Sequence, residues 1–249
     1  MITLLLSLLF ITTIFIYAYY TVAHYEKDLP LKGNNILLLT AHPDDECMFF
    51  GPTLSSLRSS GKKSRIHVLC LSTGNADGLG NIRKKELLRS CQTFDILPSN
   101  TKALNHDGLQ DGMKNNWSSK TIANIIQDYV TKHKIDTIIT FDDYGVSGHP
   151  NHIASYFGVK EYAQNYPDIQ VYKLLSINLL RKYILTIDLL PVSLKWLIYK
   201  PENIIFVSSP GDYLLTHKAM RQHRSQLVWF RWLYVTFSRY MYINELQKI

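Results

Sequence analysis

The sequence is poor in cysteine, with Cys47, Cys70 and Cys91 as its three thiols, and no two of them form a C-x-x-C pair. This scarcity excludes a disulfide framework and a thiolate zinc cluster, and it is typical of a domain kept on the reducing side of a membrane. We expect all three to be buried free thiols.

Signatures of nucleotide and nucleic-acid binding are also missing. The glycine-rich stretch TGNADGLG at 73–80 contains neither G-x-G-x-x-G nor a P-loop lysine. The formal net charge is +7, but the 27 Lys and Arg residues are scattered along the chain rather than gathered in one basic module. The sequence therefore indicates no nucleic-acid partner, and a surface close to anionic lipid is the simpler explanation of the charge.

A long apolar run opens the chain. Residues 2–23 carry no charged side chain and would extend about 33 Å as a helix. No Lys or Arg precedes the run, whereas Lys27 and Lys32 follow it. We interpret 2–23 as a single transmembrane anchor and 24–34 as a linker, and the positive-inside rule places the folded domain, 35–249, on the cytoplasmic side.

From residue 35 onward, strand-like apolar runs alternate with helical patterns. Strands are expected at 35–41, 65–72, 101–106, 136–142, 169–177 and 203–209, with helices at 46–60, 81–94 and 118–133. This alternation predicts an α/β fold, a Rossmann-like, three-layer, doubly wound and mainly parallel sheet. Because ligands bind such sheets at the carboxyl ends of the strands, the polar clusters that follow the first four strands should meet at one edge.

Two of these clusters have the composition of a metal site. HPDDE at 42–46 follows the first strand, and HPNH at 149–152 follows the fourth. Imidazole and carboxylate are suitable ligands for Zn²⁺, and a catalytic zinc site uses three protein groups while leaving a position for water. Either motif alone could be a turn that caps the next helix, but the pair supplies three ligands with a carboxylate and an imidazole to spare, as hydrolysis requires.

Three motifs carry a family resemblance: AHPDDE at 41–46, GVSGHPNH at 145–152 and KAMRQHRSQ at 218–226. They resemble the zinc-dependent de-N-acetylases of the LmbE-like superfamily, and within it the eukaryotic N-acetylglucosaminyl-phosphatidylinositol (GlcNAc-PI) de-N-acetylases, over about residues 35–226. The resemblance implies hydrolysis of the N-acetyl group of GlcNAc-PI, the second step of glycosylphosphatidylinositol (GPI) anchor biosynthesis. It also implies a protein of the endoplasmic reticulum membrane whose catalytic domain is cytoplasmic.

The resemblance also implies roles for individual residues. His42, Asp45 and His152 would bind zinc, although Fe²⁺ or Co²⁺ suits the same ligands. Asp44 would be the general base, and His149 would be the imidazolium that stabilises the oxyanion.

Other residues would recognise the substrate by the same resemblance. Arg83 would approach the inositol phosphate, and a substrate-binding aspartate would be Asp107, preferred over Asp111. His223 would contact the substrate or be buried as a structural residue, and Glu46 would cap a helix or orient a ligand.

The last third of the chain contains two more apolar segments. Asp188, Pro191 and Lys195 argue against a second membrane span at 183–199. The aromatic and basic segment 227–243 is typical of a chain lying at lipid headgroups, or of an ordinary aromatic core element.

Three other functions compete with this interpretation. They are a de-N-acetylase of another acetylated glucosamine conjugate, a metallophosphoesterase, and a non-catalytic membrane scaffold that binds a sugar lipid. A two-metal phosphoesterase would need more bridging ligands than these loops offer.

Overall fold

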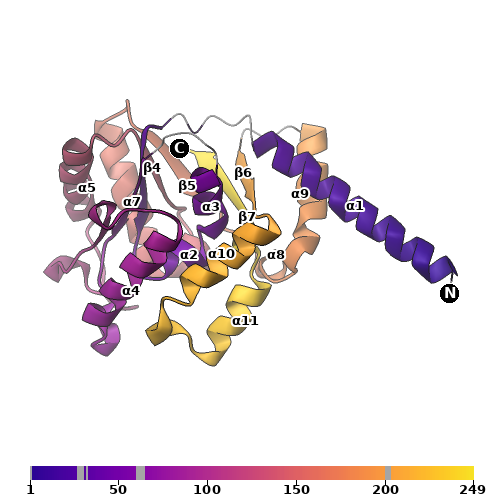
Figure 1. The fold of residues 1–249 in the computed structure, drawn as a ribbon. Helices are drawn as coiled ribbons and strands as arrows, with labels where there is room; N and C mark the ends of the chain where they lie inside the picture. The colour runs from indigo at the N-terminus through magenta and orange to yellow at the C-terminus, as the bar shows by residue number, and fades with distance from the viewer. Residues whose placement is uncertain (1, 27–30, 32, 60–64, 200–202) are drawn as a thin grey trace.

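A seven-stranded sheet with the order β3-β2-β1-β4-β5-β7-β6 forms the centre of the molecule (Figure 1). The structure is a computed structural model that describes residues 2–26, 31, 33–59, 65–199 and 203–249. The strands are β1 (Asn35–Thr40), β2 (Arg65–Cys70), β3 (Thr101–Ala103), β4 (Thr137–Phe141), β5 (Gln170–Leu174), β6 (Ile204–Val207) and β7 (Ile243–Lys248). The strands β3, β2, β1, β4 and β5 are parallel, whereas β7 pairs antiparallel with both β5 and β6.

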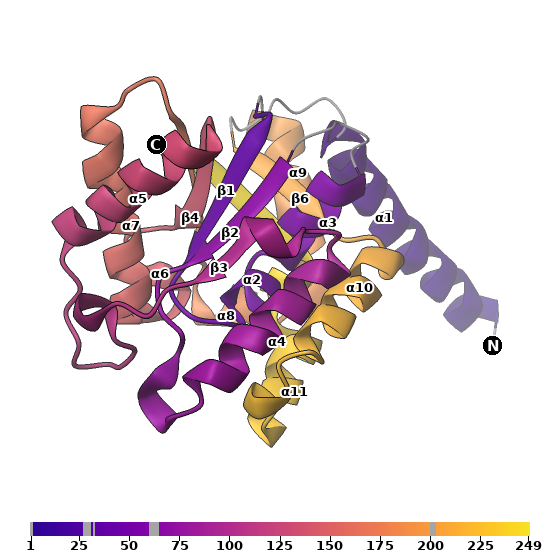
Figure 2. The same ribbon diagram turned by 60° about the vertical axis from the view of Figure 1, so that its left-hand side comes forward.

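Helices cover both faces of this sheet. The helices are α1 (Ile2–Glu26), α2 (Asp45–Met48), α3 (Gly51–Ser59), α4 (Gly80–Thr93), α5 (Ser119–His133), α6 (Gly145–Gly148), α7 (Pro150–Asn165), α8 (Leu179–Lys182), α9 (Leu189–Tyr199), α10 (Pro210–Met220) and α11 (Trp229–Phe237). Helices α5 and α7 lie together on one face, and α3, α4 and α10 lie on the other (Figure 2). The predicted α/β fold with a mainly parallel sheet is confirmed, but strand β7 was not predicted.

The central strand explains why the sheet folds in this order. Leu37, Leu38 and Leu39 of β1 are all at most 1% exposed, because helices cover both faces of a parallel sheet and its strands are apolar on both sides. The chain passes from β1 to β2 on one side, while β4 pairs with the other side of β1. A crevice therefore opens beyond the carboxyl ends of β1 and β4, where the winding direction changes.

The apolar run at the start of the chain forms α1, which extends into the predicted linker and packs against α9 and β6. In the described part of the chain, no helix is long and apolar enough to cross a bilayer. The predicted transmembrane anchor at 2–23 is therefore not found as a membrane-spanning helix among these residues. The side chains of residues 2, 4, 8 and 22–26 lie outside the described part, as do residues 27–30 and 32 of the predicted linker.

The two late apolar segments become parts of the domain wall. The carboxylate of Asp188 is fully buried and accepts a hydrogen bond from Arg181 Nε at 2.7 Å and another from Arg239 Nε. Residues 227–243 form α11 and lead into β7, with Val235 buried and Trp229 exposed. The aromatic segment is therefore partly core and partly surface.

Candidate active site

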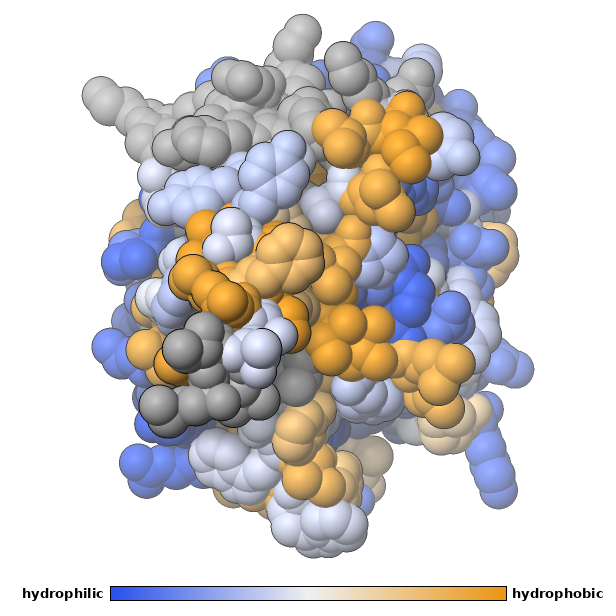
Figure 3. All heavy atoms as spheres, turned by 90° about the vertical axis from the view of Figure 1, so that its right-hand side faces the viewer, coloured by the Kyte–Doolittle hydropathy of each residue, from blue (hydrophilic) through white to orange (hydrophobic). Residues whose placement is uncertain are grey.

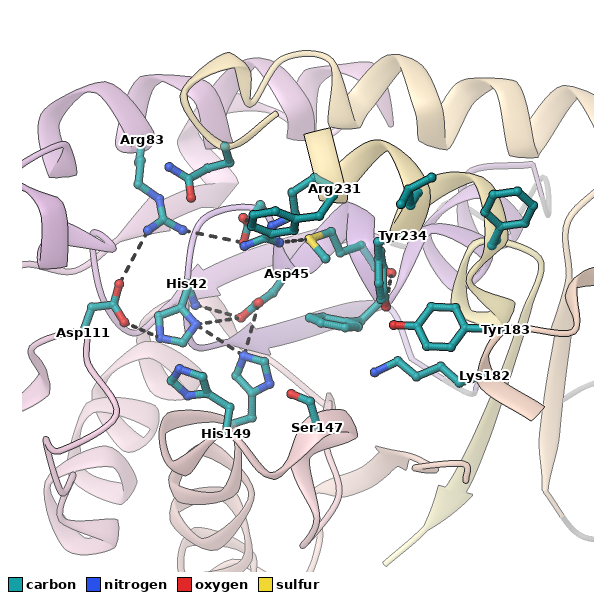
Figure 4. Close-up of a pocket in the computed structure, with 18 of the residues that line it drawn as sticks. His42, Asp45, Arg83, Asp111, Ser147, His149, Lys182, Tyr183, Arg231 and Tyr234 are labelled. Carbon is teal, nitrogen blue, oxygen red and sulfur yellow. Dashed lines mark hydrogen bonds and ion pairs between the residues drawn. The ribbon is translucent and has the colours of Figure 1, made fainter. Parts of the chain in front are cut away.

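A cavity of about 810 Å³ opens at the carboxyl ends of β1 and β4 (Figure 4). The loops after the first four strands all contribute to its lining, as expected from the strand order. The polar side chains that line it are His42, Asp44, Asp45, Asp77, Arg83, Asp111, Ser147, His149, His152, Lys182, Gln226 and Arg231.

The loop after β1 holds its carboxylates in a strained turn. Asp44 has φ = 118°, a conformation that costs free energy in a non-glycine residue and recurs at functional sites. Asp45 begins α2, and its Oδ2 accepts hydrogen bonds from the backbone N–H groups of Ala41 at 3.0 Å and His42 at 2.8 Å. These bonds fix the carboxylate so that Oδ1 lies 3.3 Å from His152 Nε2.

The loop after β4 is strained as well. Gly145 and Val146 have φ angles of 63° and 66°, and the carboxylate of Asp142 accepts a hydrogen bond from the Gly145 N–H at 2.9 Å. Pro150 then begins α7, with His149 as its N-cap residue, so His152 lies in the first turn. Because the φ angle of proline suits the first position of a helix, Pro150 fixes where α7 begins and so places His149 and His152 at the cavity.

Hydrogen bonds on the far side of each ring determine which nitrogen carries the proton in His42 and His152, the two predicted histidine ligands. His42 Nε2 lies 3.0 Å from Asp111 Oδ1 and 3.1 Å from Asn151 Oδ1, both acceptors, so this nitrogen carries the proton. His152 Nδ1 donates to the carbonyl of Gly145 at 3.0 Å. His42 Nδ1 and His152 Nε2 therefore keep free lone pairs.

These free lone pairs converge. His42 Nδ1 lies 3.3 Å from His152 Nε2 and 3.8 Å from Asp45 Oδ2. The predicted ligands His42, Asp45 and His152 thus offer two imidazole nitrogens and a carboxylate, a donor set that fits Zn²⁺. His149 is a further candidate ligand, because it forms a cluster with His42 and His152 in which the ligand atoms lie within 4.8 Å of one another.

The surroundings of His149 favour its neutral form, and its role as an imidazolium stays a prediction. Burial, followed by the neighbouring His42 and His152, lowers the pKa of His149 to about 4. Its Nδ1 accepts a hydrogen bond from the Asn151 N–H at 3.2 Å, so the proton of the neutral ring is on Nε2. His149 can therefore donate one hydrogen bond without carrying a charge.

Asp44 has the environment of a base. It is 2% exposed, and its Oδ2 has no hydrogen-bond partner among the described residues. Burial raises the pKa of Asp44, while Arg231, 3.3 Å from Oδ2, and Arg83, 3.7 Å from Oδ1, offset part of that rise. A carboxylate held between two arginines with one oxygen unbonded is ready to accept a proton.

Arg83 lines the cavity but is largely occupied by the protein itself. Its Nη1 donates to the Gly74 carbonyl at 2.9 Å and its Nη2 to the Pro43 carbonyl at 2.8 Å. It also lies 3.5 Å from Asp111, which therefore joins Arg83 to His42, a predicted metal ligand. Asp111 takes the place that was predicted for Asp107.

Two predicted substrate contacts lie away from the cavity. Asp107 is exposed, because the turn that buries Leu109 directs it outward. His223 is fully buried, and its Nε2 lies 2.7 Å from Glu46 Oε1. Glu46 Oε2 also accepts the backbone N–H of Asp44 at 3.0 Å, so Glu46 and His223 lie behind Asp44 and hold its backbone.

The C-terminal third supplies cavity residues that sequence reasoning did not assign. They are Lys182 and Tyr183 around α8, and Phe230, Arg231, Leu233, Tyr234 and Phe237 of α11. Only the basic and aromatic composition of 227–243 hinted at them.

A Rossmann-like sheet whose edge holds two histidines and a carboxylate that fit a metal ion, next to a buried carboxylate without a hydrogen bond on one oxygen among the described residues, defines a hydrolase. Comparison makes this more specific: residues 37–163 match the PIG-L family profile, described as GlcNAc-PI de-N-acetylase, and the chain belongs to this family. The resemblance seen in the sequence motifs is thereby confirmed, and with it the prediction of a deacetylase.

Curated relatives and solved structures agree with this assignment. A probable N-acetylglucosaminyl-phosphatidylinositol de-N-acetylase of Schizosaccharomyces pombe is 41% identical over 219 residues, 88% of each chain. The N-acetylglucosaminyl-phosphatidylinositol de-N-acetylase of Bos taurus is 41% identical over 224 residues, 89% of this chain and 86% of that one. The N,N'-diacetylchitobiose deacetylase of Pyrococcus horikoshii shares the fold, with a TM-score of 0.62 at 17% identity over 93% of this chain and 91% of that one.

Proposed function

We propose that this protein hydrolyses the N-acetyl group of GlcNAc-PI to give glucosaminyl-phosphatidylinositol and acetate, the second step of GPI-anchor biosynthesis. The observation that carries the proposal is the convergence of free lone pairs from His42, Asp45 and His152 next to the unbonded oxygen of Asp44. Relatives named for this reaction align over most of the chain and support the substrate.

The proposed metal is Zn²⁺, held by His42, Asp45 and His152. Fe²⁺ or Co²⁺ suits the same donors. When bound, such an ion lowers the pKa of water and polarises the acetamide carbonyl.

The residues of the chain perform the proton transfers. Asp44 accepts a proton from the attacking water at its unbonded Oδ2 and passes it to the departing amine of glucosamine. His149 donates its Nε2–H to the oxygen that becomes negative in the tetrahedral intermediate. Arg83 and Arg231 hold Asp44 in place, and Asp111 holds His42.

The walls of the cavity suit the rest of a glycolipid. Its volume of about 810 Å³ is within the range for small-molecule sites. The metal ligands and Asp44 lie at the end formed by the sheet, whereas Phe230, Leu233 and Phe237 of α11 provide apolar surface for acyl chains.

We further propose that the protein works at the endoplasmic reticulum membrane, with its cavity facing the cytoplasm. Apolar side chains gather on the face that carries α1 and α9, including Leu5, Leu9, Leu194 and Ile198 (Figure 3). Trp229 of α11 is 75% exposed, and the net charge of +7 favours anionic lipid. Flotation with vesicles of phosphatidylcholine and phosphatidylinositol tests this, because a protein that stays out of the vesicle fraction has no such surface.

The reaction is tested by incubating purified protein with GlcNAc-PI and measuring acetate with and without a chelator. Zinc-loaded protein is expected to release acetate and the chelated protein is not. Soluble N-acetylglucosaminyl-inositol tests the alternative substrate class, and release of acetate from that compound alone would overturn the assignment of the lipid.

A further inference from the structure

The side chain of Lys182, the last residue of α8, reaches the cavity at the end opposite Asp111 (Figure 4). The residue is 8% exposed, and its ammonium lies 5.6 Å from the ring centre of Tyr234 and 5.9 Å from those of Tyr183 and Tyr240. Three tyrosine rings thus hold a cation in place through their electron-rich faces.

Lys182 lacks an anionic partner in the described part of the chain. Lys173 pairs with Asp143 at 3.5 Å and Lys195 with Glu245 at 3.6 Å, whereas no carboxylate lies within ion-pair distance of Lys182. Burial accordingly lowers the pKa of the Lys182 ammonium. A buried cation without a counter-charge destabilises a fold, so its presence at a cavity indicates an anion that arrives with the ligand.

The other cations of the cavity are already neutralised. Arg83 and Arg231 both face the carboxylate of Asp44, and Arg83 also faces Asp111. Lys182 is therefore the cation of the described cavity wall that is free to bind an anion.

We propose that Lys182 binds the phosphodiester of the substrate and so makes the enzyme select phosphoinositol-linked N-acetylglucosamine over uncharged glycosides. This inference rests on the proposed function. Along the cavity the metal ligands come first, then Lys182 with Tyr183, and the apolar side chains of α11 line the wall beside them (Figure 4). In GlcNAc-PI the phosphate is likewise set apart from the acetamide, and the acyl chains attached beyond it can lie along the apolar wall.

The test compares Lys182→Met with Lys195→Met, a matched loss of one lysine on α9 outside the cavity. Each is assayed on GlcNAc-PI in detergent micelles without other phospholipid, and on N-acetylglucosaminyl-inositol, which has no phosphate. Lys182→Met is expected to raise KM for GlcNAc-PI about tenfold, as the loss of one charge-assisted hydrogen bond would. KM for the phosphate-free substrate should stay unchanged, and Lys195→Met should leave both values unchanged.

A structural role would give different results. Equal losses on both substrates, or an unchanged KM for GlcNAc-PI, would overturn the proposal. An effect seen only after phospholipid vesicles are added would mean that Lys182 binds a neighbouring lipid, which also overturns it. Lys182→Arg keeps the positive charge and should restore most of the affinity, whereas a folding defect would not be restored in this selective way.

Two further measurements do not need turnover. Lys182→Met should raise the Tm, because it removes an unpaired buried cation. Calorimetry should show that glycerophosphoinositol binds wild-type protein about tenfold more tightly than Lys182→Met. If glycerophosphoinositol binds both proteins equally, the proposal for Lys182 is wrong. If binding depends on Lys182 but no acetate is released from GlcNAc-PI, only the proposed reaction is wrong.

Discussion

His42 Nδ1 and His152 Nε2 lie 3.3 Å apart, and each ring is hydrogen-bonded to an acceptor on its opposite side. Two lone pairs at this distance repel each other, and the nearby carboxylate of Asp45 cannot relieve that repulsion. A cation between them can, so the geometry of the two loops is one that metal binding stabilises.

Substitution of Asp44 should affect activity alone, whereas substitution of a metal ligand should affect both zinc content and activity. Asp44→Asn is expected to keep stoichiometric zinc and to lower kcat at least about 100-fold, because the amide cannot accept the proton of water. His152→Ala should lose both zinc and activity. Atomic absorption and an acetate assay on the same samples check this, and a zinc-loaded Asp44→Asn enzyme with normal turnover would end the assignment of Asp44 as base.

Metal removal should be visible in stability as well as in activity. Zinc at 100 times its Kd is expected to raise the free energy of unfolding by ~2.7 kcal/mol, because it binds the folded chain alone. Thermal unfolding with chelator and with graded zinc measures the shift. His152→Ala serves as the control and should show no zinc-dependent change in Tm; the same shift in that variant would place the ion elsewhere.

The ion pair behind Asp44 should matter far more than one at the surface. Glu46 and His223 are fully buried and 2.7 Å apart, so His223→Leu leaves an uncompensated buried charge and should cost about 3–5 kcal/mol. Arg58 and Asp95 form an exposed pair at 2.5 Å, so Arg58→Ala should cost less than about 1 kcal/mol. Urea unfolding measures the loss of unfolding free energy in each variant. Equal losses would contradict the conclusion that the Glu46–His223 pair matters more than the surface pair.

The free energy of unfolding should decrease in acid because His67 has a lowered pKa in the folded protein. Burial, then His133 and Arg65, lower the pKa of His67 from 6.5 to about 4 in the folded protein. Between these values the unfolded chain binds the additional proton, so the stabilisation present above pH 6.5 is lost as the pH falls towards 4. His67→Leu should reduce the slope of unfolding free energy against pH by up to about 1.4 kcal/mol per unit. Urea titrations of the zinc-free proteins from pH 6.5 down to 4.5 measure it, and parallel slopes would refute the role of His67.

Local sequence patterns were sufficient to predict the five parallel strands and the polar loops at their carboxyl ends. Apolar runs such as NILLLT give buried strands, and in a parallel sheet the residues that follow β1 and β4 must meet. The positions of His42, Asp45 and His152 follow from that rule and from motif spacing. Asp111 could not be separated from Asp107 in this way, because the choice depends on a short turn whose direction is determined by the burial of Leu109.

Strand β7 lacked a local signal because two of its four buried residues, Asn244 and Glu245, are polar. Asn244 is fully buried yet satisfied by distant partners: its Oδ1 accepts from Thr53 Oγ1 at 2.8 Å, and its Nδ2 donates to the Phe49 carbonyl at 2.8 Å. Partners so distant in the chain cannot be inferred from the sequence INELQK alone. Lys182 was missed for the same reason, since its place beside three tyrosines depends on contacts between α8, α11 and the segment before β7.

Strand β7 lies between β5 and β6 but comes after both in the chain. While the ribosome is translating the protein, β6 consequently has no neighbour with which to pair until the residues from Ile243 onward have emerged. The five parallel strands, with His42, Asp45 and His152 at their edge, are complete long before that moment. A nascent chain can therefore form the edge that carries these three residues first and add the wall made by α11 and the segment leading into β7 afterwards.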